Sequence, residues 1–287
     1  MGGMWAGGAG TIFTVLLTLG MLACVLAALH HTEVIAHRLG EPYGTLVLAV
    51  AVTIIEVALI VSLMLSSGPS TTALARDTVF AAVMIILNGM VGLCLLVGGT
   101  RHGEQSFDKY GVNASLATLA AIAVLTMVLP NFTTTTPGPY YSTAQLAFIA
   151  VVSVVLLATA LAQRIESAVS QAGAPKAVVG VIIAAVVLLP EGLAALRAAR
   201  ANRLQTSLNL ALGSALASIG LTIPAVAMVS IATGWTLTLG LDAKSSILLM
   251  LSLLVTTLSL GTGRTTVLQG VVHLVIFATY LFTTVIP

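Results

Sequence analysis

Nine apolar stretches, each about long enough to cross a bilayer as a helix, occupy nearly the whole chain. Only 7% of the residues are charged and the mean hydropathy is +1.11, values far from those of soluble domains. The connections are short, so no soluble catalytic domain is attached. Because the bilayer core offers no water, the backbone has to satisfy its hydrogen bonds within each span. We expect an all-α, polytopic transmembrane helix bundle, with spans at residues 11–30, 44–66, 77–98, 113–130, 144–163, 177–199, 206–233, 245–262 and 265–285.

Two parts of the chain repeat one pattern. Residues 32–42 and 165–175 share a Glu, a Gly and a Pro in register. Each segment is followed by an apolar helix with a single acid, Glu56 or Glu191, and then by a helix in which an Asn precedes a Gly by four residues. The pattern predicts two inverted-topology repeats, residues 1–163 and 164–287, each with its glutamate helix at the membrane centre.

The number of spans conflicts with an inverted repeat. Glu56 lies in the second span and Glu191 in the sixth, so the two helices would run parallel, whereas inverted repeats need them antiparallel. One further crossing near Gln163 and Arg164 removes the conflict and places seven of the 11 Lys and Arg residues on one side, as the positive-inside rule favours. We therefore expect that a loop and a helix are omitted near residues 163 and 164. A true junction between parallel repeats is the alternative.

Glu56 and Glu191 are the strongest candidate site residues. Each stands near the middle of an apolar stretch, where a charge costs at least about 2.5 to 3.5 kcal/mol and is rarely kept without a use. Beside Glu191, Pro190 and Gly192 weaken the helix and free backbone carbonyls for a ligand. We expect both acids to bind a metal cation and protons. Structural acids bonded to a neighbouring Ser or Asn are the alternative.

Neutral oxygens accompany the two acids. Asn88 and Asn209 offer amide oxygens, and Thr53, Ser214 and Ser218 offer hydroxyls, although the two serines fit helix packing equally well. A set made only of oxygens suits a hard cation such as Ca²⁺ or Na⁺ and disfavours zinc or copper.

Three further residues are candidates for the entrance to the site or for sensing pH. Glu33 and Glu166 flank the starts of the repeats, where they attract cations or are simply solvated acids at a helix start. His37 titrates near neutral pH and is a candidate pH sensor, with an ordinary interfacial histidine as the alternative. His273 lies alone in a span, where we expect a neighbouring helix to satisfy it.

Residues 44–56, which end at the first acid, resemble the first signature of the cation/proton exchanger family in the calcium/cation antiporter superfamily. Residues 37–44, 189–193, 207–210 and 259–264 resemble its bacterial calcium or sodium/potassium-proton antiporter branch. The resemblance implies that the two glutamates bind the transported ion. It also implies an additional N-terminal span, and an acidic loop and a span between the halves, none of which this sequence shows.

The chain departs from the superfamily pattern ahead of both acids. Val52-Thr53 and Val187-Leu188 stand where the superfamily has Gly-Asn, so the second half lacks one side-chain ligand. This difference bears on the identity of the ion rather than on the two glutamates.

Two carboxylates in a medium of low dielectric constant cannot both stay ionised and empty. The pattern therefore favours a secondary active transporter that exchanges Ca²⁺ for H⁺ by alternating access, with a Na⁺(K⁺)/H⁺ antiporter as the alternative. A channel or an intramembrane acid/base enzyme is a weaker alternative, because the repeats favour alternating access and no nucleophile motif is present. We expect no enzymatic activity, resident cofactor or nucleic-acid partner. The expected partners are membrane lipid and the transported ions, and the expected location is the bacterial inner membrane.

Overall fold

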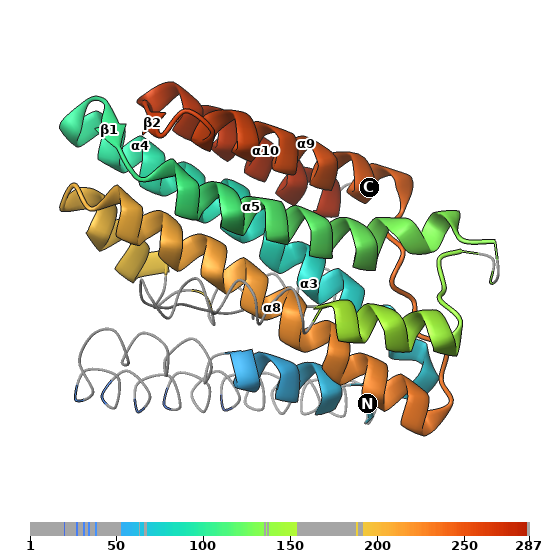
Figure 1. Ribbon diagram of the computed structural model, residues 1–287. Helices are drawn as coiled ribbons and strands as arrows, with labels where there is room; N and C mark the ends of the chain where they lie inside the picture. Colours follow the sequence, from blue (N-terminus) through green and yellow to red (C-terminus); the bar gives the residue numbers. More distant parts are fainter. Residues whose placement is uncertain are drawn as a thin grey trace, which may run out of the picture.

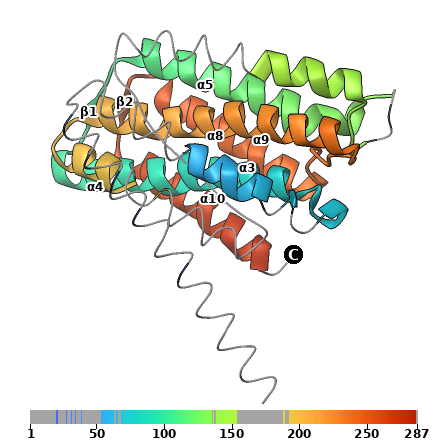
Figure 2. The ribbon, with the colours of Figure 1, turned by 90° about the horizontal axis from the view of Figure 1, so that it is seen from below.

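The computed structural model describes residues 53–62, 64–65, 68–134, 136, 138–153, 188 and 192–285, together with the single positions 20, 27, 31, 34 and 38. Long helices pack side by side along one direction (Figure 1), and the view from below shows the same alignment (Figure 2). This is the transmembrane helix bundle that the apolar stretches predict.

The principal helices and the short segments that join them follow the predicted spans closely. The α-helices are Leu74–Met84 (α3), Val91–His102 (α4), Lys109–Ala123 (α5), Leu204–Thr233 (α8), Ala243–Leu260 (α9) and Val267–Val285 (α10). Shorter turns of π-helix and 3₁₀-helix are Gly68–Thr71 (η1), Ile85–Met90 (η2), Val124–Val128 (η3) and Leu129–Phe132 (η4). Further helical segments are Thr53–Ser62, Thr143–Ser153 and residues 192–200.

Five helical stretches in the described ranges are long and apolar enough to cross a membrane: Leu74–His102, Lys109–Phe132, Leu204–Thr233, Ala243–Leu260 and Val267–Thr284. They coincide with the spans predicted at 77–98, 113–130, 206–233, 245–262 and 265–285. The span predicted at 11–30 and most of the one predicted at 177–199 lie outside the described residues.

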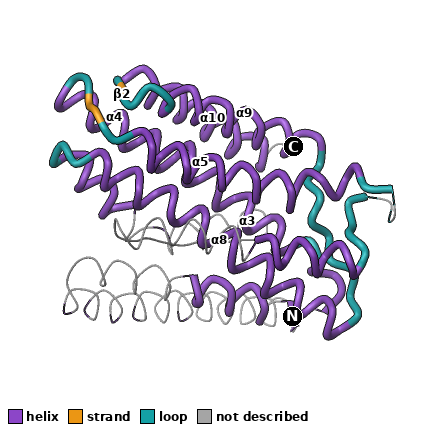
Figure 3. Tube along the Cα trace, in the orientation of Figure 1, coloured by secondary structure: helices purple, strands orange, loops and turns teal. Residues whose placement is uncertain are grey.

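Polar caps and glycines mark where several helices begin and end. Asp108 caps α5 by accepting a hydrogen bond from the Tyr110 amide, and Asp242 caps α9 by accepting one from the Ser245 amide. Gly103, with φ of 73°, ends α4. A two-stranded antiparallel ladder, β1 (Gln105–Ser106) with β2 (Arg264–Thr265), joins the loops at this end of the bundle (Figure 3).

The glutamate-bearing segments of the two repeats run in opposite directions. His102, at the end of α4, bonds the carbonyl of Arg200 just before α8, while the carbonyl of Thr72, just before α3, accepts from the amide of Thr238 just after α8. The path from α3 to α4 is therefore antiparallel to α8. Helix 53–62 precedes α3 and runs antiparallel to it, and helix 192–200 precedes α8 and runs antiparallel to it. Helices 53–62 and 192–200 are therefore antiparallel to each other, as Figure 1 shows. This is the predicted inverted arrangement.

The direction of the helix at 143–153 bears on the predicted omission. That helix begins beside the 237–241 loop, where Pro139 accepts from the amide of Gly240, and it runs toward the end that contains His102. The helix at 192–200 runs toward the same end. Since consecutive spans alternate in direction, one more crossing belongs between them. The junction at 163 and 164 lies outside the described residues, so the omitted segment stays a prediction.

Glycines in α4 and α10 allow these two helices to pack closely. A Cβ added at Gly92 would lie 2.8 Å from Cβ of His273, and one added at Gly270 would strike the backbone nitrogen of Leu96. Small residues at such crossings let two backbones approach within a membrane. Gly89 of η2 likewise lies close to α10, where an added Cβ would be 3.2 Å from the Phe277 ring.

Candidate functional site

The carboxyl group of Glu56 lies inside the bundle. Glu56 is only 2% exposed and is directed at α8, where the Ser218 hydroxyl lies 2.7 Å from each carboxyl oxygen. The two residues come from different repeats and are separated by 162 positions. The carboxyl group therefore lies at the contact between the repeats, which is where proteins with internal inverted repeats in the membrane place their binding sites.

Further hydroxyls lie on the same helix faces. Thr53 precedes Glu56 by three residues, and Ser214 and Thr222 lie one turn on either side of Ser218, spacings that place side chains on one face of a helix. All three side chains are buried, and within the described ranges their hydroxyl oxygens have no hydrogen-bond partner. A buried polar group without a partner is costly, so these oxygens are available to a ligand.

This constellation can hold a hard cation or a proton. Carboxylate and hydroxyl oxygens are ligands of the kind that Ca²⁺ and alkali cations take in proteins. Among the described residues, no group of three or more His, Cys, Asp or Glu side chains lies together. Thr222 was not among the residues predicted from the sequence. Its spacing of four residues from Ser218 places it on the same helix face, and this spacing is the signal by which it could have been found.

Asn88, a predicted cation ligand, belongs to a different set of contacts in this structure. It lies in the π-helical turn η2 and is fully buried. Its Nδ2 donates to Oγ of Ser252 at 2.8 Å on α9, and its Oδ1 lies 3.4 Å from Nδ1 of His273 on α10. The contacts of Asn88 are thus to the last two helices. Nδ1 of His273 is satisfied by a neighbouring helix, as expected.

Asn209, the other predicted amide ligand, lies too far along α8 to share an ion with Glu56. It precedes Ser218 by nine residues, which is about 13 Å along a helix axis. Its Oδ1 accepts from Nε2 of Gln205 at 3.1 Å, near the start of α8. Thr53 and Ser214 thus lie on the helix faces that carry Glu56 and Ser218, one turn from each. Asn209 lies more than two turns from Ser218, because the helix rise separates residues that the sequence pattern groups together.

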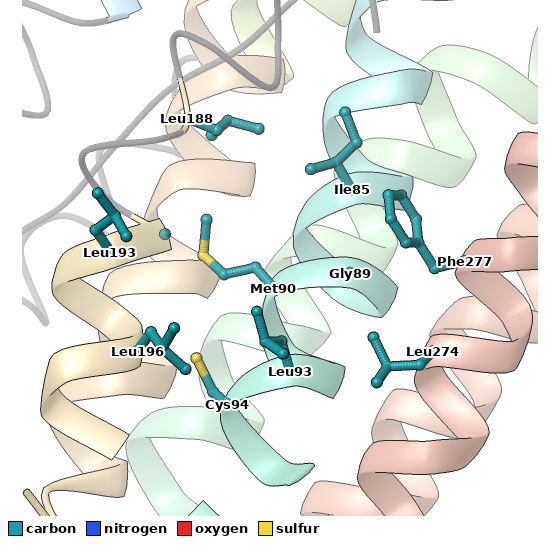
Figure 4. A pocket seen from close by; sticks show the side chains of 11 residues that line it. Ile85, Gly89, Met90, Leu93, Cys94, Leu188, Leu193, Leu196, Leu274 and Phe277 are labelled. Atoms are coloured by element: carbon teal, nitrogen blue, oxygen red, sulfur yellow. The ribbon is translucent and has the colours of Figure 1, made fainter. Parts of the chain in front are cut away.

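Glu191, Glu33, Glu166 and His37 lie outside the described residues. The positions beside Glu191 do appear: Leu188 and Gly192 line a cavity of about 300 Å³ between helix 192–200, η2 and α10 (Figure 4). The cavity walls are apolar side chains together with Met90 and Cys94, as Figure 4 shows. Among the described residues that line this cavity, no side chain offers an oxygen ligand.

A helix bundle with inverted repeats and a carboxyl group buried among hydroxyls defines an integral membrane transporter of cations. This chain belongs to the sodium/calcium exchanger protein family, whose sequence profile matches residues 9–165 and 142–286. The two matches agree with a duplicated unit, and they share the stretch 142–165.

Individual relatives agree with this assignment. The proposed ionic transporter y4hA of Sinorhizobium fredii is 46% identical over 329 residues, which cover 96% of this chain and 90% of the relative. The sodium-potassium/proton antiporter ChaA of Escherichia coli is 32% identical over 320 residues, which cover 92% of this chain and 86% of that protein. The solved structure of native YfkE, at 17% identity, has the same fold, with a TM-score of 0.70 over 94% of this chain and 92% of YfkE.

The alignments also bear on the length of this chain. Both extend over more positions than the 287 residues of this chain, so each relative contains residues that have no counterpart here. In addition, the stretch 142–165 serves both as the end of the first family match and as the start of the second. A loop and a helix omitted near 163 and 164 would produce both observations.

Proposed function

We propose that this protein is a secondary active antiporter that binds a cation and protons alternately at Glu56 and exchanges them across the membrane. The supporting observation is the position of Glu56, a carboxyl group that is 2% exposed and in contact with a hydroxyl of the opposite repeat. Burial disfavours a bare carboxylate, so the group has to carry either a proton or a bound cation. Exchange follows because one occupant must leave before the other can bind.

The contacts of Ser218 are compatible with Glu56 in either protonation state. A hydroxyl has one hydrogen to donate, yet its oxygen lies 2.7 Å from both carboxyl oxygens. If Ser218 donates to one oxygen, a proton on the other carboxyl oxygen makes the second contact favourable as well. Displacing that proton frees the carboxylate for a cation, and the hydroxyls of Thr53, Ser214 and Thr222 are placed to complete its ligands.

We propose Ca²⁺ as the exchanged cation, with Na⁺ or K⁺ as the second candidate. The reason for Ca²⁺ is the pair of acids: Glu191, the repeat counterpart of Glu56, would supply a second negative charge and match a divalent ion. The observation that favours the second candidate is the name of the Escherichia coli relative, a sodium-potassium/proton antiporter. A monovalent ion needs fewer ligands, which agrees with the absence of Gly-Asn ahead of both acids.

The charge distribution suggests how the protein is oriented. Six basic residues lie at the end of the described bundle that contains His102, whereas Arg76 and Lys244 lie at the opposite end. The positive-inside rule places the more basic end in the cytoplasm. We propose the bacterial inner membrane as the location and lipid as the surrounding partner. The six are Arg101, Lys109, Arg197, Arg200, Arg203 and Arg264.

Dissipation of a pH gradient in proteoliposomes tests the proposal. We expect addition of Ca²⁺, Na⁺ or K⁺ to release protons from the acidic side at a rate that saturates with cation concentration. Comparing the three ions identifies the substrate. Cation flux that proceeds without moving protons would point to a channel and contradict the proposal.

A further inference from the structure

A small polar pocket lies at the end of the bundle opposite His102. Its volume is about 170 Å³, and three helices line it. Two apolar residues of α3 contribute to its walls, and the polar lining consists of Asp77 of α3, Lys244 and Ser245 of α9, and Tyr280, Thr283 and Thr284 of α10. The ammonium of Lys244 donates to the carbonyl of Thr283 at 2.7 Å, which joins the start of α9 to the end of α10 (Figure 1). The lining therefore suits a polar ligand.

The pocket lies at the depth where the spans end. Of the helical stretches that are long and apolar enough to cross a membrane, one begins at Leu74, another begins at Ala243 and a third ends at Thr284. Asp77 and Lys244 are thus within one helical turn of the end of a span. In a bilayer this is the level of the lipid headgroups. The pocket therefore faces headgroup atoms rather than hydrocarbon.

Two basic and two acidic side chains lie around the pocket in the described structure. Arg76 pairs with Asp77 at 2.7 Å, and Lys244 lies near Asp242 at the start of α9. The four charges balance, so the site gives no net attraction to an anionic lipid. A ligand that carries both a positive and a negative charge matches such a set.

An exposed apolar stripe leads away from the pocket along α9. Ile247, Leu251, Leu254 and Leu258 follow Lys244 at intervals of three or four residues, which place them on one face of the helix. Their exposed fractions are 67%, 41%, 57% and 66%. In a membrane such a face lies against acyl chains. Lys244 therefore stands at the headgroup end of a surface that an acyl chain can follow.

We propose that the pocket binds the headgroup of a phospholipid that carries a primary ammonium and a phosphate, such as phosphatidylethanolamine. The carboxylate of Asp77 accepts hydrogen bonds from the lipid ammonium. The hydroxyls of Thr283 and Thr284 donate to backbone carbonyls, so their oxygens also accept from it. The site is separate from Glu56 and does not depend on the exchange activity.

The lipid phosphate takes its hydrogen bonds from α9. Lys244 has three N–H donors, and in the described structure it uses one of them for the carbonyl of Thr283. The hydroxyl of Ser245 supplies a further donor in the same pocket. Because the acceptors lie on α3 and α10 and the donors on α9, a bound headgroup connects all three helices.

Two phospholipids that differ only in the headgroup nitrogen test the proposal. Phosphatidylcholine has three methyl groups on that nitrogen and no N–H to donate. Native mass spectrometry of the purified protein, titrated with each lipid in detergent, gives two apparent dissociation constants. We expect phosphatidylethanolamine to bind about tenfold more tightly, the effect of one charge-assisted hydrogen bond.

Two substitutions separate recognition of the ammonium from recognition of the phosphate. Asp77→Asn should reduce the difference between the two lipids to less than about twofold, because the charge that selects the N–H groups is gone. Lys244→Met should weaken both lipids about tenfold and keep the difference between them, since both carry the phosphate. Glu104→Gln and Lys109→Met are the matched controls at the opposite end of the bundle, and they should leave both constants unchanged.

Equal binding of the two lipids by the unmodified protein would overturn the proposal, and so would pocket variants that bind both lipids as the controls do. Phosphoethanolamine without acyl chains should not displace the lipid at equal concentration, because it makes no contact with the apolar stripe of α9. Displacement at equal concentration would show that the pocket binds a soluble zwitterion, and it would overturn the assignment to a lipid.

Discussion

The hydroxyl of Ser218 contacts both carboxyl oxygens of Glu56 at 2.7 Å, across the contact between the two repeats. Any motion of one repeat against the other has to change this pair. Because the pair is buried, its separation would break a hydrogen bond in an apolar medium, which costs free energy. If Glu56 binds the exchanged ions, as we propose, this contact would couple the occupancy of the site to the movement of the repeats.

Glu56→Gln should abolish cation/proton exchange. Glutamine keeps the size of the side chain but cannot release a proton or neutralise a cation. Folding stability should be unchanged or higher, since a buried ionisable group is removed. Exchange at the rate of the unmodified protein, measured by pH-gradient dissipation, would falsify the assignment of Glu56 as the shared site and leave it a structural acid.

Ser214→Ala and Thr222→Val should weaken cation binding without uncoupling it from protons. Each removes a buried hydroxyl that has no hydrogen-bond partner in the described structure, so little stability is lost. We expect the half-maximal cation concentration to rise about three- to tenfold, the effect of losing one polar contact. Ser230→Ala is the matched control on α8, because its hydroxyl already bonds the carbonyl of Trp235. A similar loss of affinity in the control would show that the effect is not specific to the site.

Acid should weaken cation binding because protons and cations compete for the same carboxyl oxygens. For each proton displaced, the apparent dissociation constant should rise by about tenfold per pH unit over the range in which the site titrates. Binding measured by calorimetry at several pH values checks this slope. In Glu56→Gln any remaining binding should show a smaller slope, and an unchanged slope would mean that the protons bind elsewhere.

Gly270→Ala should destabilise the protein by about 1 to 3 kcal/mol through overpacking of α4 against α10. The added Cβ would strike the backbone nitrogen of Leu96, which cannot move aside as a side chain can. Gly111→Ala in α5 is the control, since the nearest atom to its Cβ would be 3.9 Å away and alanine favours a helix. Thermal unfolding in detergent should separate the two, and equal midpoints would contradict the close helix contact.

Asp242 should contribute stability that is lost in acid. Partial burial alone would raise the pKa of its carboxyl, but hydrogen bonds from Ser245 and the nearby Lys244 ammonium outweigh burial and hold the pKa below 3.8. A lowered folded-state pKa gives stability that is present above the unfolded value and lost as the pH falls through the folded value. Asp242→Ala should cost about 1 kcal/mol near neutral pH and progressively less below pH 3.8. A cost independent of pH would argue against the cap.

Some of these features were predictable from local sequence. The apolar stretches fix the spans because a helix is the segment that satisfies its own backbone in a membrane, and α8 and α10 follow their predicted ranges within a few residues. The acid in an apolar stretch predicts Glu56 as a site residue, and the structure buries its carboxyl group against Ser218. The repeated pattern indicates antiparallel glutamate segments, and helices 53–62 and 192–200 have that arrangement.

The partners of each side chain depend on tertiary structure. The sequence pairs Asn88 with Asn209 as equivalent ligands, yet Asn88 bonds Ser252 and His273 while Asn209 lies about 13 Å from Ser218 along α8. Helical periodicity shows which residues share one face of a helix. It does not show which neighbouring helix that face contacts. Only the packing of the repeats brings Ser218 to Glu56 across 162 residues, because that contact depends on the positions of all the helices between them.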